Sequence, residues 1–179
     1  MSQSQDYIVP SRSWDNIRGV ATSIRNRFGF SDHAYFPVIE LIELVLDQKL
    51  NMVRFEVGTY AEMDGAEGLT CPKGEFIQLR EDVYEAACRG EGRGRFTAAH
   101  ELGHFAMHTN VPHTRKALGE SVPTYQLAEP QANQFAAELL MPDGFCDHLD
   151  DEQSLIERHG VSFEAAGHRL RYLKKKGRL

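Results

Sequence analysis

Two histidines and a glutamate in the stretch "HELGH" have the types and spacing of a metal site. His100 and His104 are four residues apart, so on a helix both imidazoles lie on one face, one turn apart. Glu101 points about 100° away from His100, outside this pair but within reach of a water molecule on the metal. Histidines at this spacing are typical zinc ligands, and the glutamate between them acts as a general base. The stretch therefore predicts a catalytic zinc centre.

A catalytic zinc ion needs a third protein ligand, and the candidate is Glu129 in the next predicted helix. Asn133 follows Glu129 by one helical turn. Its amide oxygen can accept a hydrogen bond from the second ring N–H of a ligand histidine. Glu138 is the alternative ligand, but it lies further along the helix and is expected to face elsewhere.

Other polar residues near the motif have less certain roles. An extended HExxHxxGxxH site is excluded, because the chain has Met107 and Asn110 where that pattern requires glycine and histidine. His108 is expected to support the site or lie on the surface. A second group that would stabilise an oxyanion beside the metal has three unranked candidates: Tyr125, His113 and His148.

Three cysteines, Cys71, Cys88 and Cys146, are an odd number without CxxC spacing, which argues against a disulfide framework and indicates a reducing compartment. Cys88 precedes the motif and Cys71 lies in a predicted loop. Either thiolate is a candidate fourth ligand that would hold the zinc site inactive. The alternative is that both cysteines are incidental.

Hydrophobic spacing places the elements that must position these residues. Strands are expected at residues 52–57 and 75–80, antiparallel, with residues 69–75 as a loop between or beside them. The second strand is a candidate edge for an extended peptide. Helices are expected over residues 14–28, 37–50 and 82–88, from Thr97 as N-cap to Asn110, over residues 129–141, and on both sides of Gly160 with Ser162 capping the second.

The bulk composition fits one globular domain covering residues 1–179, with 41% hydrophobic and 26% charged residues. Residues 1–12 are expected to be flexible, and residues 150–179 to form a helical part of the same domain. The polar N-terminus has no apolar signal core, and no run approaches the roughly 18 apolar residues of a membrane span. These features predict a cytoplasmic protein without a membrane partner.

The net charge of −6 opposes non-specific binding of nucleic acid over the whole surface. Two basic segments remain, the glycine-rich run from Arg89 to Arg95 and the C-terminal "RLRYLKKKGRL". The first is a candidate site for a nucleic-acid activator. A flexible loop and a solvated tail are the alternatives.

The segments "RFTAAHELGHFAMH", "EPQANQFAAELLMP" and "HGVSFEAAGHRL", in this order, closely resemble the ImmA/IrrE family of zinc metallopeptidases. The resemblance implies an α+β fold, with a small, mainly antiparallel sheet packed with several helices around a gluzincin-like core. It also implies that His100, His104 and Glu129 bind one zinc ion per chain and that Glu101 is the catalytic base. Pro130, directly after Glu129, could alter how this ligand points.

Members of the family this chain resembles cleave a partner repressor of the helix-turn-helix class. The resemblance therefore implies a zinc-dependent endopeptidase that derepresses stress, mobile-element or defence genes. Two alternatives remain open. The stretch "LIERHGVSFEAAGHRL" has the pattern of a DNA-binding helix-turn-helix, and the zinc site would also suit a sensor or regulatory module without turnover. Glu101, whose evident use is proton transfer, favours the peptidase.

Overall fold

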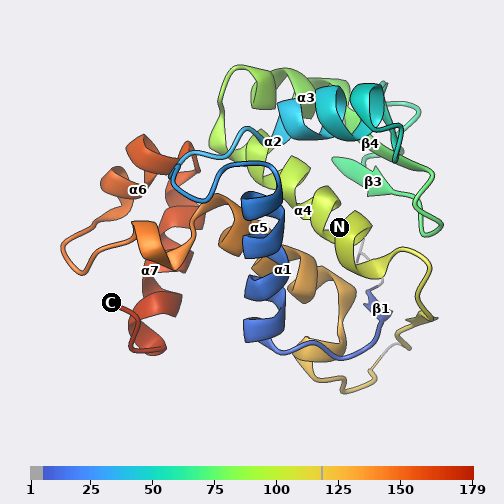
Figure 1. Cartoon of the computed structure of the whole chain (residues 1–179). Helices are drawn as coiled ribbons and strands as arrows, with labels where there is room; N and C mark the ends of the chain where they lie inside the picture. The colour runs from blue at the N-terminus through green and yellow to red at the C-terminus, as the bar shows by residue number, and fades with distance from the viewer. Residues whose placement is uncertain (1–5, 118) are drawn as a thin grey trace.

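The long helix α4 (Gly92–His108) carries the HExxH segment through the middle of an α+β fold (Figure 1). The computed structural model describes residues 6–117 and 119–179. α5 (Ala128–Leu140) packs along one side of α4, and α1 (Trp14–Arg27) packs against α5. α3 (Glu81–Cys88) and a three-stranded sheet contact α4 on the other side. The motif helix is therefore supported from both sides.

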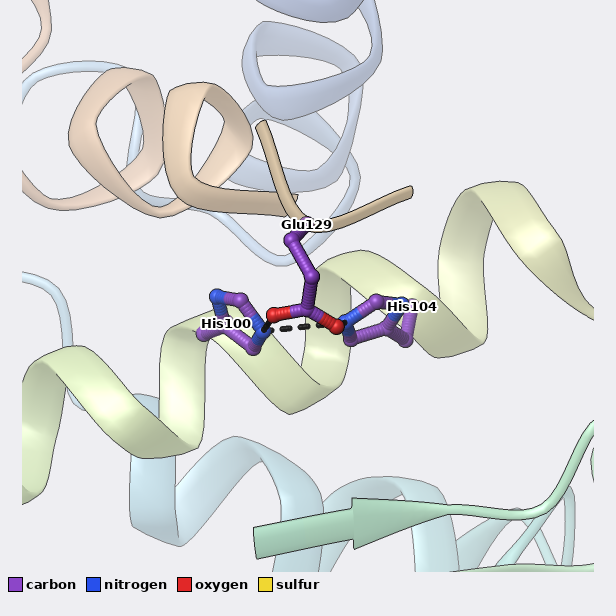
Figure 2. Close-up of side chains that lie close together, drawn as sticks. All are labelled: His100, His104 and Glu129. Carbon is purple, nitrogen blue, oxygen red and sulfur yellow. Dashed lines mark hydrogen bonds and ion pairs between the residues drawn. The ribbon is translucent and has the colours of Figure 1, made fainter. Parts of the chain in front are cut away.

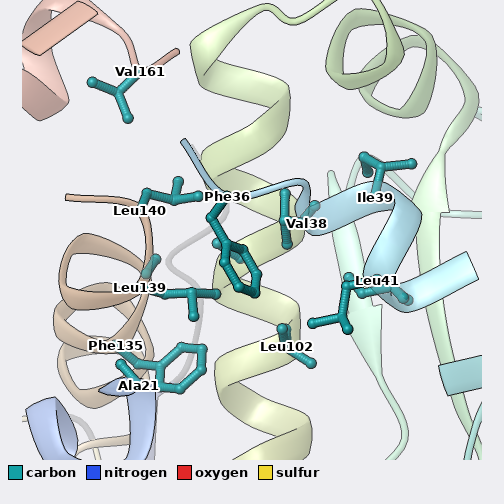
Figure 3. Close-up of a cluster of buried hydrophobic side chains, with 14 of the residues drawn as sticks. Ala21, Phe36, Val38, Ile39, Leu41, Leu102, Phe135, Leu139, Leu140 and Val161 are labelled. Carbon is teal, nitrogen blue, oxygen red and sulfur yellow. The ribbon is translucent and has the colours of Figure 1, made fainter. Parts of the chain in front are cut away.

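Buried apolar side chains from several elements meet around α4 (Figure 3). Leu102 of α4 is 2% exposed, and Phe135 and Leu139 of α5 are fully buried, as are Phe36 and Val38 from the segment that leads into α2 (Val38–Glu40). Burying one such side chain stabilises the fold by about 1.5–3 kcal/mol. This shared core fixes α4 and α5 relative to each other.

Most of the expected helices are confirmed. Gly160 ends the first C-terminal helix in the left-handed region, at φ 64°. Ser162 caps the second by accepting a hydrogen bond from the amide of Ala165 at 3.2 Å. The confirmed helices are α1, α3, α5, α6 (Glu152–His159) and α7 (Phe163–Lys175).

The helix expected over residues 37–50 is present in a modified form. It begins as α2 (Val38–Glu40) and continues as the π-helical segment η1 (Leu41–Lys49). The amide of Leu50 accordingly donates to the carbonyl of Val45, five residues earlier, at 2.9 Å. Ile39, Ile42 and Leu46 are buried as the spacing predicts, but Leu50 at the end of the segment is 42% exposed.

The sheet differs from the expectation in strand direction. β4 (Phe76–Arg80) is central, flanked by β2 (Arg54–Gly58) and β3 (Gly68–Thr70). β2 and β4 run parallel, so the antiparallel pairing predicted for them is wrong. β3 lies between β2 and β4 in the sequence and runs antiparallel to β4. The chain therefore turns back twice, and β4 has the same direction as β2. Residues 69 and 70, expected in a loop, belong to this third strand.

The start of α4 also differs from the expectation, because the predicted N-cap Thr97 lies inside the helix. The N-cap is Glu91, and residues 92–95, the second half of the glycine-rich run, form the first turn. A Cβ on Gly92 would lie 2.1 Å from the backbone carbon of Val161, and one on Gly94 would lie 2.7 Å from the Ala87 nitrogen. These two glycines therefore permit close packing of α4, while α3 ends at Cys88, directly before the glycine-rich run.

The N-terminal segment crosses the molecule near the end of α4. β1 (Tyr7–Ile8) pairs antiparallel with β5 (Thr114–Arg115), and the amide of Val9 donates to the carbonyl of Gln126 at 2.9 Å. Val9 is only 6% exposed. Residues 6–12 thus differ from the flexible start expected for residues 1–12, of which residues 1–5 lie outside the described part. Within the described residues, no helix has the length and apolar character needed to cross a membrane.

Candidate metal centre

Two side chains of α4 and one of α5 converge on a single point (Figure 2). The Nε2 atoms of His100 and His104 lie 2.9 Å apart. Glu129 Oε2 lies 3.2 Å from His100 Nε2, and Glu129 Oε1 lies 3.4 Å from His104 Nε2. A tetrahedral zinc ion with bonds of about 2.0–2.1 Å requires ligand atoms about 3.3 Å apart. The donor types and their separations therefore fit a zinc ion.

Glu129 is well oriented despite the proline that follows it. Pro130 lies in the first turn of α5, where a missing backbone N–H leaves no helical hydrogen bond unmade. The amide of Glu129 donates to Asp6 Oδ1 at 3.1 Å. Hydrogen bonds from His100 and His104 hold the pKa of the Glu129 carboxyl well below its usual range.

Glu101 lies beside the ligands, against the edge of β3. Its Oε2 accepts a hydrogen bond from the Thr70 hydroxyl at 2.7 Å, and the side chain is 6% exposed. Burial raises the pKa of Glu101, although the neighbouring His100 and His104 oppose this shift. A Cβ on Gly68 would lie 2.6 Å from Glu101 Cγ. β3 can therefore approach the carboxylate this closely only because residue 68 is glycine.

Each histidine also has a partner on its second ring nitrogen. His100 Nδ1 lies 3.0 Å from Asn133 Oδ1, as the E-x-x-x-N spacing predicts. His104 Nδ1 lies 2.9 Å from His108 Nδ1, and His108 Nε2 lies 3.0 Å from Gln131 Oε1. Burial lowers the pKa of His108 to about 4, so this imidazole is neutral near pH 7. His108 therefore supports a proposed ligand, which is one of the two roles expected for it; the other was a place on the surface.

Gln131 was missed by the sequence reasoning. It is fully buried on the face of α5 that packs against the rest of the molecule. The available signal was a glutamine flanked by residues with helical apolar spacing, because a buried amide must find hydrogen-bond partners.

A cleft of about 340 Å³ opens beside the ligands. The cleft is lined by Glu101, His104 and Glu129. One part of its wall is the segment 68–72, which includes β3, and another contains Tyr7 and His113, whose rings meet edge-on at 5.5 Å. Because β4 is central in the sheet, the edge available to a peptide at this cleft is β3, and the expectation that residues 75–80 supply it is wrong.

The three oxyanion candidates occupy different places. His113 lines the cleft, and Tyr7, which the sequence reasoning did not consider, lines it as well. Tyr125 lines a separate pocket near the start of α1. His148 is largely exposed, and its Nδ1 lies 2.9 Å from Asp147 Oδ1.

The cysteines and the alternative glutamate lie outside the ligand group. Among the described residues, only His100, His104 and Glu129 form a group that could hold a metal ion. Cys71 lines the cleft, and Cys88 is exposed at the end of α3. Glu138 forms a buried ion pair of 2.7 Å with Arg169 of α7.

The basic run that is a candidate activator site forms ion pairs and hydrogen bonds within the protein, although Arg89 and Arg93 remain largely exposed. Arg89 pairs with Glu91 at 2.8 Å, and Arg93 pairs with Glu67 at 2.5 Å. Arg95 is 1% exposed and donates to the carbonyl of Phe36 at 2.9 Å. The structure therefore gives no support to a nucleic-acid site at this run.

A family model described as the IrrE N-terminal-like domain, Peptidase_M78, matches residues 64–171. The match covers more than half of the chain and includes β3, α4 and α5. It therefore contains all three ligand residues, Glu101 and the edge strand of the cleft. No curated protein and no solved structure matches the chain significantly.

Proposed function

Because the chain belongs to the ImmA/IrrE family, whose model is the IrrE N-terminal-like peptidase domain, we propose that it is a zinc-dependent endopeptidase. The observation that carries this proposal is the convergence of His100, His104 and Glu129 beside the buried carboxylate of Glu101. The family supports peptide hydrolysis, and the donor set supports zinc as the metal.

The ligands, Glu101 and Thr70 have different roles in the proposed hydrolysis. A zinc ion held by the three ligands supplies Lewis-acid chemistry, which polarises a peptide carbonyl and makes water more acidic. Glu101 takes a proton from the attacking water and delivers it to the leaving amine. The Thr70 hydroxyl, 2.7 Å from Glu101 Oε2, keeps this carboxylate at the cleft.

The substrate binds as an extended segment along β3. β3 is an edge strand that lines the cleft, and edge strands recognise peptides by adding a strand to the sheet. Backbone hydrogen bonds of this kind tolerate many sequences, so selectivity comes from the side chains around the cleft. Leu69, which is 42% exposed, and the Tyr7–His113 pair are the nearest apolar and aromatic surfaces.

A partner repressor of the helix-turn-helix class is the proposed substrate. The family resemblance supports this choice, and cleavage would relieve repression of stress, mobile-element or defence genes. The alternative of DNA binding by α6 and α7 is weakened because Arg169 of α7 is buried with Glu138 of α5. A zinc-bound sensor without turnover is the remaining alternative.

Zinc content and cleavage should be measured together for the wild type, Glu101→Gln and Glu129→Ala. We expect about one zinc ion per chain in the wild type and Glu101→Gln, and a large loss in Glu129→Ala. Only the wild type should cut a purified repressor encoded beside its gene, detected by mass spectrometry of the fragments.

Two outcomes would contradict parts of this proposal. Full zinc content in Glu129→Ala would place the third ligand elsewhere. Zinc in the wild type without cleavage of any neighbouring repressor would favour the sensor.

A further inference from the structure

We propose that Gln131 and His108 are positioning residues that fix the ring tautomer with which His104 faces the metal. The three side chains form a buried chain of hydrogen bonds, named here the His104 relay. The inference rests on the proposed zinc site, because it concerns how one ligand is prepared for the metal. It adds two residues that lie outside the group of proposed metal ligands.

The orientation of the Gln131 amide is set by two backbone carbonyls. Gln131 Nε2 donates to the carbonyl of Pro10 at 3.1 Å and to the carbonyl of Tyr125 at 2.8 Å. Carbonyl oxygens only accept hydrogen bonds, so the NH₂ group must face them. The amide oxygen of Gln131 is therefore the atom that faces His108.

The position of the proton on His108 follows from this orientation. Gln131 Oε1 can only accept, so His108 Nε2, 3.0 Å away, carries the proton. A neutral imidazole has one N–H and one bare nitrogen, which leaves His108 Nδ1 as an acceptor. His108 is 9% exposed, and burial disfavours the doubly protonated, charged ring.

The same reasoning fixes His104. Its Nδ1 lies 2.9 Å from the bare Nδ1 of His108 and must donate the hydrogen bond between them. A neutral His104 then has a lone pair on Nε2, the atom that lies 2.9 Å from His100 Nε2 and 3.4 Å from Glu129 Oε1. The relay thus presents the nitrogen that a metal ion needs.

The two ligand histidines are prepared in different ways. His100 donates directly to Asn133, an amide on the neighbouring helix. His104 instead depends on His108 and Gln131. The Gln131 amide is in turn oriented by the carbonyl of Pro10 in the N-terminal segment and that of Tyr125 in η2 (Thr124–Gln126). The relay therefore makes the placement of these two segments part of the metal site.

A pair of nearly isosteric variants tests the relay. His108→Asn keeps an acceptor oxygen close to the position of Nδ1, whereas His108→Leu has a similar volume and no acceptor. We expect His108→Leu to weaken zinc binding by about 10–100-fold, the usual effect of losing such a support. His108→Asn should restore most of that loss, and Gln131→Met should fall between the two.

Zinc affinity is measured by competition with a chromophoric chelator, so no substrate is required. Thermal unfolding of the metal-free proteins shows whether the two His108 variants are equally folded. Equal zinc affinity in His108→Leu and His108→Asn would overturn the relay. If that equal affinity is also weaker than the affinity of the wild type, His108 acts through packing alone.

NMR of the histidine ring nitrogens gives a direct second measurement on the metal-free wild type. We expect the proton of His108 on Nε2 and the proton of His104 on Nδ1. The reverse positions would overturn the relay even if zinc binds tightly. If the wild type binds no zinc, the proposed function fails, while the NMR measurement still decides whether the relay exists.

Discussion

At the scale of single residues, the position of the Glu101 side chain depends on a glycine in β3, the strand that faces it. Gly68 lies in β3, and an added Cβ would come within 2.7 Å of Glu101 Oε1. Thr70, two residues later on the same strand, donates to the same carboxylate. β3 therefore shapes the surroundings of the proposed general base as well as the proposed binding edge.

Gly68→Ala should impair catalysis while leaving the metal site intact. The methyl group displaces the Glu101 carboxylate, and a misplacement of this size can lower the rate by about 100-fold. Zinc content should remain that of the wild type, because the three atoms nearest to the added methyl group all belong to Glu101. Turnover of the cleaved repressor and zinc per chain are the two measurements.

Gly144→Ala is the matched control for Gly68→Ala. A Cβ there meets nothing within 4 Å, and we expect activity like that of the wild type. Wild-type turnover in Gly68→Ala would mean that Glu101 tolerates the displacement or is not the base.

At the scale of elements, the contact between α4 and α5 sets the distance between the ligand histidines and Glu129. Gly103 lies between the motif residues, and a Cβ on it would lie 2.8 Å from Cδ1 of the buried Phe135. The two helices approach closely because this position has no side chain.

Gly103→Ala should lower both stability and zinc affinity. Alanine favours a helix by about 1 kcal/mol over glycine, but overpacking a core costs about 1–3 kcal/mol. We expect a net loss in the free energy of unfolding, measured with urea on the metal-free protein. Zinc competition should also show weaker binding, because α5 carries Glu129 away from α4.

Gly19→Ala provides the comparison for Gly103→Ala. Gly19 lies in α1 and meets nothing within 4 Å, so this variant should be slightly more stable than the wild type. A stabilised Gly103→Ala with unchanged zinc affinity would contradict the proposed role of the close contact.

The sequence predicts the ligand group better than it predicts the sheet, for a physical reason. His100, His104, Glu129 and Asn133 lie on two regular helices, where spacing alone determines which side chains share a face. Alternation along a strand carries no information on the direction of its partner, so the parallel β2–β4 pair could not be foreseen. β3 is also too short to show a periodic pattern.

Glycine was the other source of error. Gly92 and Gly94 favour a loop when only local preference is considered, because glycine disfavours helices, so the N-cap of α4 is expected too late, at Thr97. In the structure they allow the start of α4 to contact the backbone near Val161 and Ala87. Such contacts join residues far apart in the sequence, and no local pattern reports them.

At the scale of the whole molecule, two buried arginines connect the motif helices to the C-terminal part. Arg95 of α4 donates to the carbonyls of Gly160 and His159, at the end of α6. Arg169 of α7 donates to the carbonyl of Met141 and pairs with Glu138 of α5. Residues 150–179 are thus anchored to the helices that carry the metal ligands.

Arg169→Met should destabilise the whole fold. It leaves the Glu138 carboxylate buried without its partner, which typically costs about 3–5 kcal/mol. Urea unfolding of the metal-free protein measures the loss. The double variant Glu138→Met with Arg169→Met should recover much of it, because both buried charges are then gone. Equal stabilities of the single and double variants would show that the ion pair is not the cause.

The pairing of β1 with β5 has a consequence for synthesis of the chain on the ribosome. Tyr7 and Ile8 emerge early, but their partners Arg115 and Thr114 follow more than 100 residues later. At about 5–20 residues per second, this delay is roughly 5–20 s. During that time the nascent protein lacks the strand pairing that places Tyr7 at the cleft, and it also lacks Gln131, whose amide later donates to the Pro10 carbonyl. The proposed metal site and its cleft can therefore be assembled only after Glu129, which follows β5 in the chain, has been synthesised.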